Sequence, residues 1–178
     1  MRTTFFASAL ILGCIAAAAP QARKPRVSRA PISITSTVQH SKTRLVIRTR
    51  VGKRYSLLVS RDSNVSANAQ PNKVKVIGVI NKTAIILADV YPSIPGSLSY
   101  CGAGEESFLR VISVATKPPK ETLKLKLESC RENLELDSEG VEWLPQTGTL
   151  RIHWLTGPAG NGTPEVREIS LTNEGRPR

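Results

Sequence analysis

The sequence predicts an all-β fold, built as a single antiparallel β-sandwich or barrel-like domain with one disulfide. Many segments alternate apolar and polar residues with a period of two, which is typical of strands that bury one face. Turn-forming residues interrupt these segments about every 8–12 residues, a spacing typical of sandwiches and barrels. Beyond residue 22, no window long enough for a helix has helical spacing of its apolar residues.

The expected strands follow one another along most of the chain. Residues 123–127 alternate leucine with lysine, which indicates a strand with one buried face. The segments 73–80 and 83–91 are almost continuously apolar, so we expect them to be covered on both faces and to lie centrally, joined at Asn81-Lys82. The expected strands are 32–38, 43–51, 55–59, 73–80, 83–91, 107–115, 121–129, 133–137, 141–144, 149–155 and 165–171.

Residues 43–59 predict a hairpin with a basic outer face. Apolar side chains at odd positions point inward, and arginines at even positions point outward. Gly52-Lys53 fits a two-residue type II′ turn between the arms. Arginines on neighbouring arms repel one another unless something anionic binds there. The candidate basic surface consists of Arg44, Arg48, Arg50, Lys53 and Arg54.

Residues 1–22 are interpreted as a secretory signal peptide, because Arg2 precedes an apolar stretch that ends in alanines. Cleavage after Ala19 or after Ala22 fits the small-residue rule, and we favour the second. A lipoprotein with lipid on Cys14 is the alternative, although the residues after Cys14 stay apolar; an uncleaved anchor is a third reading. We therefore expect a periplasmic or secreted protein, with a basic tail at 23–31, a β-domain at 32–172 and a C-terminal tail at 173–178.

Removal of the first 22 residues leaves two cysteines, Cys101 and Cys130. An even pair in an exported protein predicts a disulfide. The alternative is two buried free thiols.

The positive charge is concentrated in the first half of the chain. Residues 23–90 contain 14 Lys and Arg against Asp62 and Asp89, whereas residues 91–178 contain 10 against 12 carboxylates. This footprint indicates an acidic partner, such as an anionic envelope polymer, an acidic protein or a nucleic acid. Export and an aromatic content of only 4% disfavour nucleic acid. A solubilising surface is the alternative, and membrane contact is expected only if Cys14 is lipidated.

The segment 91–106 predicts a long, stiff loop, because it holds two prolines and three glycines. Long loops in compact domains often bind partners. The candidate contacts are Tyr91, Tyr100, Glu105 and Glu106. The alternative is a connection that a disulfide tethers and whose glycines only turn the chain.

No motif for catalysis, for a metal or for a cofactor is found. The sequence contains no P-loop, no Gly-x-Ser-x-Gly elbow, no His-Glu-x-x-His and no zinc-type Cys/His spacing, so we expect no enzyme, no metal and no cofactor. His153 has the opposite parity to Ile152 and Trp154, and we expect it to face solvent or a sheet neighbour. Trp143 and Trp154 are expected to pack in the protein rather than to bind sugars.

An exported disulfide β-domain without catalytic residues is similar in kind to small periplasmic inhibitor and immunity proteins, which occlude toxins or wall-degrading enzymes. This resemblance of class implies a protein-binding module that uses the 91–106 loop and has a protein partner in the cell envelope. A binder of anionic envelope polymer through the basic hairpin is the second hypothesis. An enzyme of unknown reaction is the third, and it needs a pocket with at least two perturbed ionisable groups.

Overall fold

The computed structural model describes residues 32–39, 42–49, 52–66, 68–94, 104–160 and 162–178, and this part of the chain is all-β, as predicted. Ten strands and no helix are found in these ranges. The strands are β1 (Ser33–Gln39), β2 (Lys42–Arg48), β3 (Arg54–Ser60), β4 (Lys73–Ile80), β5 (Ala84–Pro92), β6 (Glu105–Ser113), β7 (Lys120–Ser129), β8 (Glu135–Leu144), β9 (Thr149–Thr156) and β10 (Glu165–Ser170).

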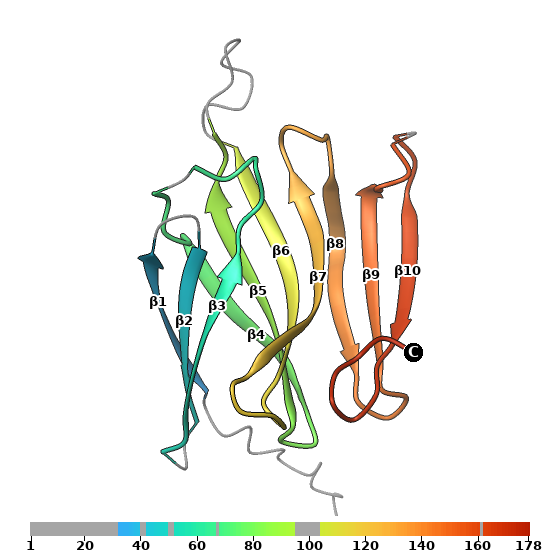
Figure 1. Ribbon diagram of the computed structural model, residues 1–178. Helices are drawn as coiled ribbons and strands as arrows, with labels where there is room; N and C mark the ends of the chain where they lie inside the picture. The colour runs from blue at the N-terminus through green and yellow to red at the C-terminus, as the bar shows by residue number, and fades with distance from the viewer. Residues whose placement is uncertain (1–31, 40–41, 50–51, 67, 95–103, 161) are drawn as a thin grey trace, which may run out of the picture.

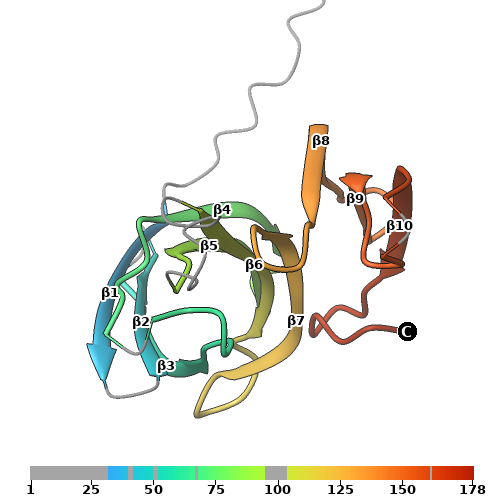
Figure 2. The same cartoon turned by 90° about the horizontal axis from the view of Figure 1, so that it is seen from above.

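The strands form three antiparallel sheets with the orders β1-β2-β3, β4-β5-β6-β7 and β10-β9-β8 (Figure 1). Each strand pairs with its neighbour in the chain, which antiparallel hairpins with short connections permit. Seen from above, the four-stranded sheet lies between the other two (Figure 2).

Two apolar clusters cover the two faces of this middle sheet. The first cluster joins it to the β8–β10 sheet through Ile86, Leu109 and Val111 on one side and Leu150, Ile152 and Trp154 on the other. The second cluster joins it to the β1–β3 sheet and contains Leu45, Ile47, Leu57, Val59, Ile85, Leu87 and Ile112. Successive residues of β5 therefore point into different clusters, which confirms the prediction that 83–91 is covered on both faces.

The β4–β5 hairpin agrees with the sequence pattern in part. The expected strand 73–80 is β4, and Asn81 and Lys82 both have positive φ, as the central residues of a type I′ turn require. Ile80 pairs with Ala84, so three residues connect the strands. The prediction that 73–80 lies centrally is wrong, because β4 is an edge strand of its sheet and its Val79 is 39% exposed. Alternation in 121–129 is confirmed as well, because Leu123 and Leu125 pack against the first cluster and Leu127 belongs to it.

The turn of the β2–β3 hairpin differs from the prediction. Strand β2 ends at Arg48 and β3 begins at Arg54, so the connection is longer than two residues. The register places Leu45 opposite Leu57, which puts both on the buried face. A two-residue turn at Gly52-Lys53 would shift the register by an odd number of residues and point one of these leucines to solvent. The connection is therefore longer than two residues because only such a register buries both Leu45 and Leu57.

Two expected strands, 133–137 and 141–144, are one strand in the structure, β8, with an irregular stretch inside it. The Asp137 carboxylate accepts hydrogen bonds from the backbone N–H groups of Glu139 (2.8 Å) and Gly140 (3.0 Å), and Gly140 has a positive φ of 62°. This turn-like bulge has the local signals of a loop, which explains why the sequence suggested a break.

Both tryptophans pack within the protein. Trp154 is 1% exposed, and its indole N–H donates to the backbone oxygen of Leu127 at 2.8 Å. Trp143 lies so close to Gly78 of β4 that a Cβ at position 78 would overlap its indole ring. Gly78 is therefore a close-approach position between β4 and β8.

Candidate functional site

The outer face of the β1–β3 sheet carries exposed cations at the end where the β2–β3 hairpin turns. We call Arg48, Arg54 and Lys53 of the adjoining β2–β3 connection the basic face; all three side chains are exposed. Arg48 lies directly opposite Arg54 across the β2–β3 ladder, and Ser33 lies opposite Arg48 on the other side. The predicted neighbourhood of arginines on the two arms is thus present in the register.

No carboxylate from this sheet balances the basic face. Residues 23–61 contain eleven Lys and Arg and not one Asp or Glu. Of the ion pairs found within the described ranges, none involves Arg48, Lys53 or Arg54. Like charges directly opposite each other destabilise a sheet, so this arrangement is costly without an anionic ligand.

Two further residues of the candidate surface have different surroundings. Arg44 is half-buried on the same side of β2, and its Nη1 donates to Ser56 Oγ at 3.2 Å. Arg50 lies outside the described residues. Leu58, opposite Arg44 in the register, is 43% exposed and adds an apolar side chain to the same side of the sheet.

The four residues proposed for the recognition loop do not lie together at the surface. Tyr91 and Glu106 are strand residues, paired across β5 and β6, and both are 0% exposed. Glu105 is exposed, and its Oε1 accepts a hydrogen bond from Asn72 Nδ2 at 3.2 Å. Tyr100 lies outside the described residues. In this conformation Tyr91 and Glu106 offer no side chain to a partner.

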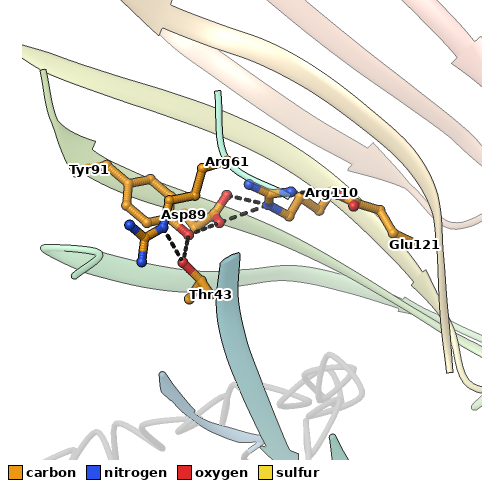
Figure 3. Close-up of polar contacts among 6 residues, drawn as sticks. All are labelled: Thr43, Arg61, Asp89, Tyr91, Arg110 and Glu121. Carbon is orange, nitrogen blue, oxygen red and sulfur yellow. Dashed lines mark hydrogen bonds and ion pairs between the residues drawn. The ribbon is translucent and has the colours of Figure 1, made fainter. Parts of the chain in front are cut away.

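A buried ion pair between Asp89 of β5 and Arg110 of β6 lies where these strands face the β1–β3 sheet (Figure 3). Arg110 Nε donates to Asp89 Oδ1 at 2.9 Å and to Oδ2 at 2.8 Å, and both side chains are 0% exposed. Arg110 Nη1 also donates to Glu121 Oε1 of β7 at 2.5 Å. The guanidinium thus ties three strands of the middle sheet together.

Hydrogen bonds continue from Asp89 to the first sheet. The Tyr91 phenol donates to Asp89 Oδ2 at 2.7 Å, and the Tyr91 and Thr43 hydroxyls are hydrogen-bonded at 3.2 Å. Arg61 Nε donates to Thr43 Oγ1 at 3.1 Å (Figure 3). Burial, together with the charge of Asp89, raises the pKa of Tyr91, so the phenol keeps its proton and acts as a donor.

This network is best explained as a structural element between two sheets. Its charged groups are directed at one another, and Tyr91 packs edge-on against Phe108, whose ring also lies 5.4 Å from the Arg110 guanidinium. Two buried atoms have no hydrogen-bond partner within the described residues, Glu106 Oε2 and Arg110 Nη2. Buried charges of this kind are costly unless paired, and here the Tyr91–Thr43 hydrogen bond extends the network from the middle sheet to the β1–β3 sheet.

Sequence reasoning missed the network, although a signal was present. Asp89 is the one charged residue of β5, and Arg110 is a single cation among the apolar residues 108–112 of β6. A lone charge in a strand that is buried on both faces needs a partner, and the neighbouring strand supplies one.

The remaining predicted positions are His153 and the two cysteines. His153 points away from the first cluster, as predicted, and its Nδ1 lies 3.1 Å from Glu139 Oε2. Cys130 follows β7, whereas Cys101 lies outside the described residues, so the disulfide stays a prediction. In the described ranges no group of three His, Cys, Asp or Glu is arranged to hold a metal ion, and no helix is long and apolar enough to span a membrane.

The chain matches no protein family model, and no curated protein or solved structure is significantly similar to it. Function is therefore inferred from the fold and from the basic face.

Proposed function

We propose that this protein is an exported β-domain that binds an anionic component of the cell envelope through its basic face. The observation that carries the proposal is the pairing of Arg48 with Arg54 on a sheet without carboxylates. Such an arrangement lowers stability, and an anionic ligand offsets the repulsion. The anionic polymer expected from the sequence belongs to this class of partner.

Three further properties belong to the same proposal. Residues 1–22 direct export and are removed, Cys101 and Cys130 form a disulfide, and the sheets are the layers of one sandwich-like or barrel-like domain. An intact mass of the protein isolated from the envelope tests the first two together. Cleavage after residue 22, lipid on Cys14 and loss of two hydrogens each give a distinct mass.

The experiment that tests binding uses soluble polyanions and a pair of charge-matched variants. Wild type is expected to bind polyphosphate or an acidic glycan, with an affinity that falls steeply as salt rises. The variant R48Q/R54Q loses two charges from the basic face. The control K73Q/K75Q loses two charges from exposed positions of β4, on another sheet. Equal binding by the two variants, or binding that salt does not weaken, would refute the proposal.

The same variants distinguish this proposal from the protein-binding hypothesis. An inhibitor or immunity protein would be recovered in a stoichiometric complex with one envelope enzyme or toxin, and the complex would survive R48Q/R54Q. Of the four loop residues predicted for this role, Glu105 is the described one with an exposed side chain, so Glu105→Gln is the variant that should weaken such a complex.

A further inference from the structure

We infer that the anionic component is a phospholipid bilayer and that the basic face docks on its headgroups. This inference rests on the proposed function, which it narrows from anionic envelope material in general to a membrane surface. Three features of the β1–β3 sheet support it: its orientation, its chemistry and the point where the preceding chain joins it.

The orientation suits a surface rather than a strand of polymer. The β1–β3 sheet curves around the second cluster (Figure 2). Ile47 and Tyr55 face that cluster, so their chain neighbours Arg48 and Arg54 lie on the outer side of the curve. Both arginines are exposed there, so their charges are open to a broad partner. A bilayer presents its charges over such an area, and each Lys or Arg near an anionic surface contributes about 1 kcal/mol.

The chemistry of the face suits phosphate and not sugar rings. Two of its three cations are arginines, whose guanidinium groups bind phosphate with two parallel hydrogen bonds. The one aromatic residue of the sheet, Tyr55, lies opposite Ile47 on the inner side and packs on the second cluster. A glycan binder would need such a ring outside. The exposed Leu58 is instead an apolar side chain that can enter the headgroup region.

The preceding chain joins the sheet beside the basic face. Ser33 begins β1 and is opposite Arg48, which in turn is opposite Arg54. The nine residues before Ile32 include Arg23, Lys24, Arg26 and Arg29. In the sequence these four cations directly precede β1, so they add to the positive charge of the sheet.

The test is co-sedimentation of the mature protein with vesicles at low and at high salt. Vesicles of phosphatidylglycerol mixed with phosphatidylcholine are compared with vesicles of phosphatidylcholine alone. Wild type should bind only the anionic vesicles. R48Q/R54Q should bind them about 30-fold more weakly, which corresponds to two charges at about 1 kcal/mol each, whereas K73Q/K75Q should bind like wild type.

The outcomes separate the inference from the proposal beneath it. One outcome is that R48Q/R54Q binds soluble polyphosphate or acidic glycan more weakly than wild type while wild type does not bind anionic vesicles. That result refutes the bilayer as the ligand and supports the basic face as the anion-binding surface. If neither ligand distinguishes R48Q/R54Q from K73Q/K75Q, both are refuted. Circular dichroism of each variant establishes that a loss of binding is not a loss of fold.

Discussion

Arg48 and Arg54 lie directly opposite each other on adjacent strands, both exposed and neither in an ion pair with a described residue. Cross-strand neighbours of like charge repel across a distance shorter than the screening length at physiological salt. The repulsion lowers the stability of the hairpin, so a substitution that removes it should raise the free energy of unfolding.

Arg54→Glu should therefore stabilise the domain while it abolishes binding to anionic ligands. A carboxylate at position 54 attracts the Arg48 guanidinium, whereas the original side chain repels it. We expect a gain of about 0.2–1 kcal/mol in the free energy of unfolding, measured with urea at low salt. At about 1 M salt the gain should nearly vanish, since charges are then screened within about 3 Å.

Lys75→Glu is the matched control, because Lys75 is exposed but lies opposite Ala88. It makes the same change in net charge without relieving a direct repulsion. An equal gain from both variants would attribute the effect to net charge and not to the Arg48–Arg54 pair.

The Asp89–Arg110 pair should be among the most sensitive positions for stability. Asp89→Ala leaves the Arg110 guanidinium buried without its principal partner, and we expect a loss of about 3–5 kcal/mol. Arg151→Ala, which removes an exposed cation from Glu142 and Glu168, should change stability far less, because solvent screens these exposed ion pairs. Urea unfolding followed by tryptophan fluorescence measures both.

The double variant D89A/R110M tests whether the loss comes from the stranded charge. It should be more stable than D89A, because no buried cation is left unpaired. If the double variant is less stable than D89A, the network contributes through packing instead.

Gly78→Ala should destabilise the protein because its new methyl group would overlap the Trp143 ring. Overpacking of this kind typically costs about 1–3 kcal/mol. The second change in G78A/W143L removes the ring and should restore part of the loss. Thermal unfolding of the three variants measures the coupling; additive effects would show that residues 78 and 143 do not interact.

The Asp62 carboxylate should contribute to acid sensitivity. Burial opposes its ionisation, but hydrogen bonds from the Asn64 N–H and from Lys126 Nζ outweigh burial and hold the pKa of Asp62 below 3.8. A carboxyl whose pKa is lowered by folding stabilises the fold at pH values above its ordinary pKa of 3.8. This contribution is lost as the pH falls through the pKa of the folded state.

Asp62→Asn should therefore flatten the fall in unfolding free energy below about pH 4 and leave its shape unchanged near neutrality. Glu174→Gln, at an exposed residue that pairs with Arg176, serves as the control. A pH profile identical to wild type in D62N would contradict the assignment.

Much of the fold was predictable because burial imposes a simple period on strands. The limits of β4, the turn at Asn81 and Lys82, and the inward leucines of β7 all follow from local pattern. The β2–β3 connection and the bulge in β8 did not, since each depends on what the opposite strand buries. Local turn signals at Gly52 and Gly140 are real, but the pairing partner decides how the chain uses them.

The candidate site was predictable in part for the same reason. Arg48 and Arg54 are exposed as the alternation indicated, and Lys53, which was predicted to lie in the turn, is exposed as well. Tyr91 and Glu106 were assigned to a loop because prolines and glycines lie between them, yet strand pairing continues past Tyr91 and buries both. The number of residues that pair in a hairpin depends on tertiary contacts, which a local sequence motif does not contain.

Every strand in the described ranges forms its backbone ladder only with the strand before or after it in the chain. Contacts of this kind close short loops, which favours rapid assembly. If the chain is exported as proposed, the β1–β3 sheet can therefore form before the middle sheet has left the translocation pore. The apolar inner side of the β1–β3 sheet would then stay exposed until β5 and β6 pack against it. During that interval these hairpins are the part of the chain most prone to aggregation or proteolysis.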